Sequence, residues 1–383
     1  MSKTVRNRNV IRRLFQGLIL TSLSVLVSII LAETLLHLFP GLLPVELQLT
    51  VRDRGIAHAT IGSLPEPGST GLLWTRDFKI THEIDAHGFR NPGPWPTTAD
   101  VVTIGDSLTF GYGVEAHEAW PRILELETGR SVVNLGLIGA GPQQHLRLYE
   151  TFGRALKPQL VVIGAFVAND FWDTEMFDRW EHSGAPGNYL IWRDFGRPTA
   201  ERLERFAGRY RYFMRQNSRL YQLVRYGQSV LRSRRAEPPV VVEPRPGVAL
   251  QLRPAYLEAT TTYAHKGSRY FETAIESLRE LRDQAAARGA STLVLLQPSK
   301  EETYMALLGQ PIPDPAKDFR EALEELAIAY VDLGPLFRDR AQRGEVLFFA
   351  TDGHPNADGY RLAAEGLLGY LKERRVLSLP SRL

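Results

Sequence analysis

The chain contains five short, nearly continuous apolar runs, and segments with a helical spacing of apolar residues separate most of them. The runs are Val101–Ile104, Ser131–Leu135, Leu160–Ile163, Ser291–Leu296 and Ala329–Leu333. The helical segments are Glu118–Glu127, Gln144–Leu156, Tyr270–Arg288 and Phe319–Ile328. Short apolar strands that alternate with helices are typical of a parallel sheet covered on both faces. The pattern therefore predicts a three-layer α/β/α domain around a parallel five-stranded sheet.

The N-terminal segment has the pattern of a membrane anchor. Residues 14–32 carry no charge and are long enough to cross a bilayer as a helix. Five basic residues and no acid precede them: Lys3, Arg6, Arg8, Arg12 and Arg13. We predict a cytoplasmic basic tail over 1–13, an uncleaved single-pass signal anchor over 14–38, and a periplasmic or extracellular body. A cleaved signal peptide is the alternative, but no small-x-small cleavage site is evident and the apolar stretch is longer than a usual signal core.

The remaining organisation comes from composition and spacing. Residues 39–98 are rich in Pro and Gly and are predicted to form an irregular lead-in to a domain over 99–383. More than one hundred residues separate the third and fourth strands, which predicts an insertion at about 171–268. Apolar residues in this insertion recur at helical spacing, as an amphipathic helix requires: Leu203, Phe206, Tyr210, Phe213, Leu220, Val224 and Leu231. Such a helix either packs on the body as a cap or lies against anionic lipid beside the anchor.

The basic residues are concentrated in two segments, so the net charge is a weak argument for a nucleic-acid partner, and we expect none because the predicted location of the body is outside the cytoplasm. The 383 residues carry a net charge of +3. They include no cysteine, so disulfides and thiolate chemistry are excluded. Twelve arginines stand against three acids over residues 193–235. Because the basic residues concentrate there and in the N-terminal tail, the rest of the chain is net negative.

A serine follows the first predicted strand in the stretch "VVTIGDSLTFGYGV". Ligands of open parallel sheets bind at the carboxyl ends of strands, so Ser107 is either a turn residue or a nucleophile. Near the C-terminus, "DGHPNADGY" contains Asp352 and His354. Pro355 favours an extended His354, and residues i and i+2 of an extended segment point the same way. A carboxylate beside the imidazole would then fix its tautomer; alternatively, both residues only cap the next helix.

Three further residues at the same sheet edge are candidates. Gly139 offers a backbone N–H and Asn169 a side-chain amide, the donors that a tetrahedral acyl intermediate requires. Each also has a plainer interpretation, since Gly139 suits a turn and Asn169 a helix cap. Lys300 follows the fourth strand and is a candidate substrate-binding residue, although a solvated loop charge is the interpretation we favour.

Taken together in chain order, these blocks resemble the SGNH/GDSL hydrolase superfamily. "GDSLTFGYG" is similar to its first block, "NLGLIGAG" to its second, "AND" to its third and "DGHPN" to its fifth. The resemblance covers about residues 99–170 and 290–372 and implies a flavodoxin-like fold. It also implies Ser107 as nucleophile, His354 as general base, Asp352 as the orienting acid, and an oxyanion hole of the Ser107 amide, Gly139 and Asn169.

Two positions depart from the family pattern. Val167 stands where the third block usually has glycine, and Thr351 stands three residues before His354, where the family commonly has aspartate. The i, i+2 spacing of Asp352 and His354 resembles that of membrane-associated polysaccharide O-acetylation proteins within the superfamily. Asp358 is a more distant alternative for the acid and fits the first turn of the last helix.

The sequence thus predicts a membrane-anchored serine esterase that acts on O-acyl esters, with O-acetyl favoured, of an envelope glycan or lipid. An O-acyltransferase of envelope polysaccharide with the same triad is one alternative, and a non-catalytic polysaccharide-binding or scaffold module is another. The mechanism requires neither a metal nor an organic cofactor. The expected partners are the acylated substrate and the membrane, the latter through the anchor and the arginine-rich insertion.

Overall fold

The computed structural model describes residues 3–44, 47, 55–185, 187–233, 239–253, 263–309 and 314–376. Within these ranges, the side chains of 3–11, 232 and 233 are not described. Arg234 and Arg235 of the arginine-rich segment, parts of the predicted lead-in and parts of the insertion lie outside the described residues. The chain divides into two compact units, which we describe separately. One comprises residues 1–51 and 204–237, and the other comprises residues 52–203 and 238–383.

The larger unit is built on five parallel strands, as the sequence predicted. They are β5 (Val101–Gly105), β6 (Val132–Gly136), β7 (Leu160–Ala165), β10 (Ser291–Leu296) and β11 (Ala329–Asp332). Their order in the sheet is β11-β10-β7-β5-β6. From β5 the chain goes first to β6 on one side and then to β7 on the other, so the strand order reverses at β5. The carboxyl end of β5 is therefore the place where this type of sheet opens a crevice for ligands.

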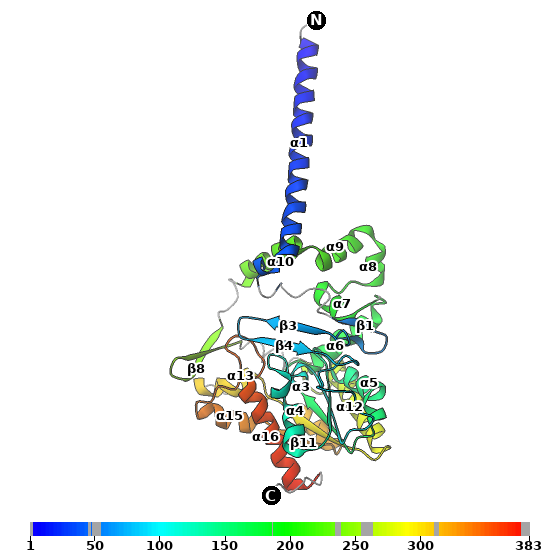
Figure 1. The fold of residues 1–383 in the computed structure, drawn as a ribbon, viewed down its shortest axis with the longest axis vertical. Coiled ribbons are helices and arrows are strands. Elements are labelled where there is room, and N and C mark those ends of the chain that lie inside the picture. Colours follow the sequence, from blue (N-terminus) through cyan, green and yellow to red (C-terminus); the bar gives the residue numbers. More distant parts are fainter. Residues whose placement is uncertain are drawn as a thin grey trace. The chain divides into compact units, whose positions relative to one another are not determined.

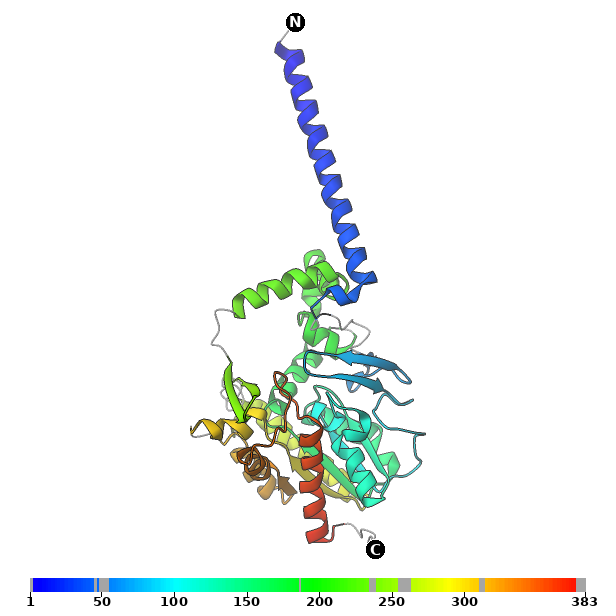
Figure 2. The same ribbon diagram turned by 60° about the vertical axis from the view of Figure 1, so that its left-hand side comes forward.

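Helices cover both faces of the sheet (Figure 1). The apolar core on one face joins α5 (Pro142–Thr151), α12 (Arg269–Ala286) and α14 (Lys317–Glu325). The core on the other face joins α4 (Trp120–Thr128), α15 (Gly334–Gln342) and α16 (Ala357–Arg374). Successive strand residues point to opposite faces, so Val102 lies in the first core and Val101 in the second. Figure 2 shows α16 beside α4, which it contacts. The three-layer fold is confirmed.

A row of three glycines crosses the carboxyl edge of the sheet. Gly136, Gly105 and Gly164 stand in register on β6, β5 and β7. The helix that follows β5 is α3 (Ser107–Phe110), and it lies directly on this row. A methyl group on Gly105 or Gly164 would collide with the Thr109 side chain, and one on Gly136 would collide with the Phe110 backbone. The short helix can therefore approach the sheet only because these positions lack a Cβ atom.

The predicted irregular lead-in contains two hairpins instead. β1 (Ile56–His58) pairs antiparallel with β2 (Gly62–Leu64), and β3 (Thr70–Trp74) pairs with β4 (Lys79–Glu83). These strands have three to five residues, too short for their alternation to stand out from the surrounding Gly and Pro. The insertion supplies α6 (Asp170–His182), α7 (Tyr189–Phe195), α8 (Ala200–Glu204) and a third hairpin, β8 (Val240–Arg245) with β9 (Val248–Leu252).

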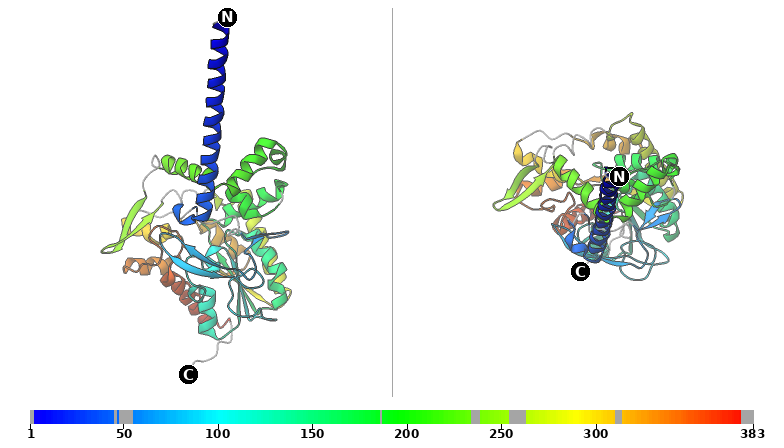
Figure 3. Two further views of the ribbon diagram at one scale, coloured as in Figure 1. Left: turned by 45° about the horizontal axis from the view of Figure 1, so that its top comes forward. Right: turned by 90° about the horizontal axis from the view of Figure 1, so that it is seen from above.

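The smaller unit consists of α1 (Lys3–Leu38), the short turn η1 (Pro40–Leu42), α9 (Phe206–Asn217) and α10 (Arg219–Ser233). Figure 3 shows α1 as one unbroken helix. Its segment Arg12–Leu38 is, within the described part of the chain, the one helix that is long and apolar enough to span a membrane. A signal sequence near the N-terminus meets the same criterion. The predicted amphipathic segment is not one helix but three: Leu203 lies in α8, and the other apolar residues lie in α9 and α10, which are separated at Ser218.

The glycine row generates a prediction for Gly136→Ala. The added methyl group must displace the α3 backbone, and we expect a loss of unfolding free energy of about 1–3 kcal/mol or more. Gly71→Ala on β3 is the matched control, since nothing lies within 4 Å of its added Cβ; its effect should stay within about 0.5 kcal/mol. Urea unfolding of both variants measures this. Equal unfolding free energies of the Gly136→Ala and Gly71→Ala variants would contradict a close contact between Gly136 and the α3 backbone.

Candidate active site

The residue at the turn after β5 is Ser107, the first residue of α3. Asp106 precedes it as the N-cap, and its carboxylate accepts a hydrogen bond from the Leu108 amide at 2.9 Å. Gly111 ends the helix in the left-handed conformation, with φ of 81°. The strand, tight turn and one-turn helix therefore fix the position of the Ser107 hydroxyl at the carboxyl edge of the sheet, where its side chain is largely buried.

Ser107, His354 and Asp352 form a continuous hydrogen-bonded chain. The His354 Nε2 atom lies 2.8 Å from Ser107 Oγ, and its Nδ1 atom lies 2.6 Å from Asp352 Oδ1. The same carboxylate oxygen accepts the His354 backbone N–H at 2.9 Å. Burial disfavours ionisation of Asp352, but the hydrogen bonds and charge of His354 outweigh it and hold the pKa of this carboxyl below its usual value. Asp352 is thus kept ionised beside the imidazole.

The capping alternative for this segment is wrong for Asp352 and His354. The N-cap of α16 is Asn356, whose side chain accepts the Gly359 amide at 3.0 Å. Asp358 lies in the first turn of that helix, as the sequence suggested. Asp352 instead uses its carboxylate on His354.

The two candidate oxyanion donors follow the neighbouring strands. Gly139 lies between β6 and α5 with φ of 69°, a conformation that favours glycine. In the described part of the chain, no hydrogen-bond acceptor meets the Gly139 or Ser107 amide. Asn169 occupies the N-cap position of α6, but its side chain does not cap the helix. Its Nδ2 atom donates to Asp106 Oδ2 at 3.2 Å, which uses one of its two hydrogens and fixes the orientation of the amide.

Charged residues that carried no sequence signal lie next to these donors. The Arg193 guanidinium occupies the space that a Cβ atom of Gly139 would need, and it pairs with the buried Asp173 at 3.3 Å. Burial raises the pKa of Asp173 to about 7, and Arg193 opposes that rise. Burial also raises the pKa of Asp106, against hydrogen bonds from Leu108 and Asn169. In the sequence, Arg193 is indistinguishable from the other arginines of its segment, because only tertiary contact brings it to Gly139.

Comparison with known families identifies the chain at this point. Residues 103–362, more than half of the chain, match the GDSL-like lipase/acylhydrolase family. The chain belongs to this family. It is therefore a serine hydrolase of the GDSL type, as the motifs implied. No curated protein matches it.

Solved structures of GDSL proteins are similar to this chain at low sequence identity. A protein assigned to the lipolytic G-D-S-L family from Desulfitobacterium hafniense DCB-2 is 18% identical, with 74% of this chain and 100% of that chain covered and a TM-score of 0.35. A family member from Veillonella parvula DSM 2008 is 14% identical, with coverages of 71% and 97% and a TM-score of 0.36. An acetyl xylan esterase is 10% identical, with coverages of 71% and 98% and a TM-score of 0.39.

The loop that carries Asp352 in this GDSL hydrolase is held by residues far away in the sequence. Asp77, in the turn between β3 and β4, accepts the Thr351 amide at 3.1 Å, the Thr351 hydroxyl at 2.5 Å and the Asp352 amide at 2.6 Å. The Gln251 amide on β9 donates to Ala350 O at 2.8 Å. Sequence reasoning missed Asp77, because an acidic residue in a turn is an ordinary turn feature.

Lys300 holds the same loop from another side. It begins α13 (Lys300–Tyr304), is only 1% exposed, and donates from Nζ to Ala350 O at 2.9 Å and to Asp352 O at 3.2 Å. The interpretation of Lys300 as a solvated loop charge is therefore wrong, because its amine is buried against the loop that carries Asp352. Its candidate role in substrate binding stays a prediction.

Val167 is buried in the core, and Asn169 two residues later still reaches Asp106.

Among the described residues, no group of three or more His, Cys, Asp or Glu side chains is arranged to hold a metal ion. The chemistry available at the site is that of a hydroxyl, an imidazole and a carboxylate in line, with amide donors beside them.

The first prediction for this site concerns Asp77→Asn. The amide keeps the size of the side chain but loses the charge that three donors share, so the Asp352 loop should shift. We expect kcat for ester hydrolysis to fall about 10–100-fold, the order that small misplacements of catalytic groups cost, with little change in KM. Glu83→Gln on the same hairpin is the matched control. Similar thermal unfolding of both variants, together with unchanged kcat for Asp77→Asn, would exclude a positioning role for Asp77.

The second prediction concerns the pH dependence of stability. Burial lowers the pKa of Lys300 to about 8, below the value of about 10.4 in an unfolded chain. Between these values the unfolded chain binds the proton more tightly, so the charged amine costs stability at pH 8 and less as the pH rises. From pH 8 to 10 the unfolding free energy of the wild type should therefore rise relative to that of Lys300→Met. Urea unfolding at several pH values measures the difference, and parallel curves would contradict it.

Proposed function

We propose that this chain is a single-pass, membrane-anchored serine esterase that uses Ser107, His354 and Asp352 as a catalytic triad. The observation that carries the proposal is the relay of 2.8 Å from Ser107 Oγ to His354 Nε2 and 2.6 Å from His354 Nδ1 to Asp352 Oδ1. A relay of this kind suits a base that takes the serine proton while a carboxylate stabilises the resulting imidazolium. Membership of a lipase/acylhydrolase family supports an acyl ester as substrate.

In the first half of the reaction, His354 Nε2 accepts the hydroxyl proton as Ser107 Oγ attacks the ester carbonyl carbon. The carbonyl oxygen becomes negatively charged and is stabilised by the amides of Ser107 and Gly139 and by the second Nδ2 hydrogen of Asn169. Collapse of the tetrahedral intermediate breaks the bond to the alkoxy group, which leaves as an alcohol after His354 returns the proton to it. The product of this half is an acyl ester of Ser107.

In the second half, His354 removes a proton from water, and the hydroxide attacks the acyl carbon. The same amides stabilise the second oxyanion. Ser107 leaves and recovers its proton from His354, and the carboxylic acid is released. Asp106 contributes to both halves as a positioning residue, because its carboxylate holds both the first turn of α3 and the Asn169 amide.

The substrate we propose is an O-acyl ester, with O-acetyl favoured, of an envelope glycan or lipid. The proposal rests on the apolar segment Arg12–Leu38 and the basic residues before it, which favour a cytoplasmic N-terminus and a periplasmic or extracytoplasmic catalytic domain. An enzyme tethered in this way meets substrates of the cell envelope. The spacing of Asp352 and His354, similar to that in polysaccharide O-acetylation proteins, favours O-acyl transfer to a sugar hydroxyl as the second candidate function.

The triad assignment predicts the order of three variants. Ser107→Ala should lower kcat/KM for p-nitrophenyl acetate by about 10⁴-fold or more while leaving the fold intact. His354→Ala should lose nearly as much, because it removes the base, and Asp352→Asn should lose less, because the imidazole persists. Release of p-nitrophenol by the purified full-length protein measures this, with near-ultraviolet circular dichroism to verify folding. Substantial activity of Ser107→Ala would exclude Ser107 as the nucleophile.

The preferred acyl chain and acceptor follow from the same assay. Rates with p-nitrophenyl acetate, butyrate and octanoate separate an acetyl-sized acyl site from a lipid-sized one. Adding an oligosaccharide acceptor separates the two candidate functions, since an acyltransferase forms an acylated sugar at the expense of free acetate. Folded wild-type protein that neither turns over these esters nor reacts with a fluorophosphonate would favour a binding or scaffold function.

A further inference from the structure

The membrane-span candidate α1 contains a single acidic residue, Glu33, within the segment Arg12–Leu38. Its carboxylate accepts three hydrogen bonds from the start of α10: from the Ser218 hydroxyl at 2.8 Å, the Arg219 amide at 2.6 Å and the Leu220 amide at 3.1 Å. Amides in the first turn of a helix have no intrahelical acceptor and carry partial positive charge. The carboxylate of α1 and the N-terminus of α10 therefore satisfy each other.

This contact fixes the position along α1 at which α10 begins. Glu33 lies five residues before the end of the apolar segment at Leu38, which is about 7.5 Å along a helix. An ionisable side chain in a span is costly to bury unless it has a partner, and partners of this kind usually mark a functional contact. If α1 crosses a bilayer, the first turn of α10 is held near the boundary between the acyl chains and the headgroups.

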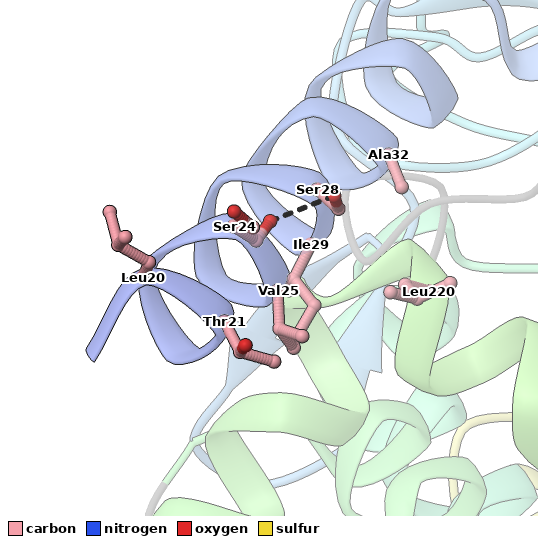
Figure 4. Close-up of a pocket in the computed structure, with 8 residues that line it drawn as sticks. All are labelled: Leu20, Thr21, Ser24, Val25, Ser28, Ile29, Ala32 and Leu220. Carbon is pink, nitrogen blue, oxygen red and sulfur yellow. Dashed lines mark hydrogen bonds between the residues drawn. The ribbon is translucent and has the colours of Figure 1, made fainter. Parts of the chain in front are cut away.

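The side chains at the start of α10 suit that depth. Figure 4 shows a groove along α1 that Leu220 of α10 faces from one end. The groove has a volume of about 520 Å³ and is lined mostly by apolar residues, with no charged side chain: Leu20, Thr21, Ser24, Val25, Ser28, Ile29, Ala32 and Leu220. Leu220 thus extends the apolar surface of the span onto α10.

The helices α9 and α10 of the smaller unit each expose an apolar stripe with arginines nearby. On α9, Phe206, Tyr210 and Phe213 follow one another at helical spacing, and Phe206 and Phe213 are 75% and 58% exposed. On α10, Val224 and Leu231 continue the stripe that starts at Leu220, and they are 53% and 63% exposed. Arg209, Arg211 and Arg225 are exposed. Apolar stripes with exposed cations are typical of helices that lie in the plane of an anionic membrane surface.

We propose that α9 and α10 form an in-plane membrane-surface element that binds anionic lipid headgroups, and that Glu33 ties it to the anchor. The apolar stripe enters the boundary of the acyl chains, while the arginines pair with headgroup phosphates. The proposal rests on α1 being retained as a membrane anchor, and it assigns the lipid-facing role, rather than the cap role, to the amphipathic segment.

The test uses the natural absence of cysteine in this chain. Single variants Leu231→Cys and Ser229→Cys in the full-length protein carry a nitroxide on the apolar stripe and on the opposite face of α10. The protein is reconstituted in nanodiscs of phosphatidylcholine alone or with phosphatidylglycerol. We expect the Leu231 label to be more accessible to oxygen than to a water-soluble nickel chelate, the Ser229 label to show the reverse, and the contrast to increase with phosphatidylglycerol and decrease with salt.

A label at Val25→Cys in the middle of α1 separates the possible failures. If the Val25 label is protected from nickel while the Leu231 and Ser229 labels are equally accessible in both lipids, the surface element is excluded and the anchor stands. If the Val25 label is itself accessible to the nickel chelate, the membrane anchor is excluded, and the in-plane surface element that depends on it is excluded too. Glu33→Gln should raise nickel accessibility at Leu231, whereas the neighbouring change Thr34→Val should not. Hydrolysis of p-nitrophenyl acetate by the same nanodiscs reports the proposed esterase function independently.

Discussion

Close contact between α3 and the sheet is the constraint on which the rest of the catalytic unit depends. Three glycines in register on β6, β5 and β7 leave no side chain at the point where the helix crosses the strand ends. The glycine row therefore allows α3, which begins at Ser107, to lie directly against the edge of the sheet. Gly139 and Asn169 follow β6 and β7, the two strands beside β5, so the sheet brings both candidate amide donors to the edge where Ser107 lies.

The acid–base half of the site has a different physical origin. His354 and Asp352 lie on a loop rather than on a strand end, and contacts within the loop, such as Phe349 N–H to His354 O at 3.2 Å, are joined by contacts from distant parts of the chain. Asp77, Gln251 and Lys300 each bond to its backbone from a different element. Such contacts act through geometry, because a loop that carries the proposed general base must hold its imidazole within hydrogen-bond reach of the Ser107 hydroxyl. The position of Ser107 thus depends mainly on local structure, whereas the position of His354 also depends on contacts with distant parts of the chain.

This division explains what the sequence could predict. Apolar periodicity along the sequence predicts the five strands and the layered fold. Short motifs mark Ser107, Asp352 and His354, and the structure brings these three side chains together. Asp77, Arg193 and the buried position of Lys300 carry none, since their partners are distant in the sequence. The hairpins of the lead-in were missed because strands of three to five residues among Gly and Pro have too few positions for a period to emerge.

The contact of Asp77 with Thr351 and Asp352 also has a consequence for the order in which the domain folds. The two partners are separated by 274 and 275 residues, so the turn that carries Asp77 leaves the ribosome long before the loop it must hold. Closing a connection of that length is entropically costly and comes late in assembly. The turn at Ser107 is therefore synthesised long before the loop that carries His354 can be held in place. The hydrogen-bonded chain from Ser107 to Asp352 is therefore complete only once the C-terminal part of the domain has packed against the hairpin that carries Asp77.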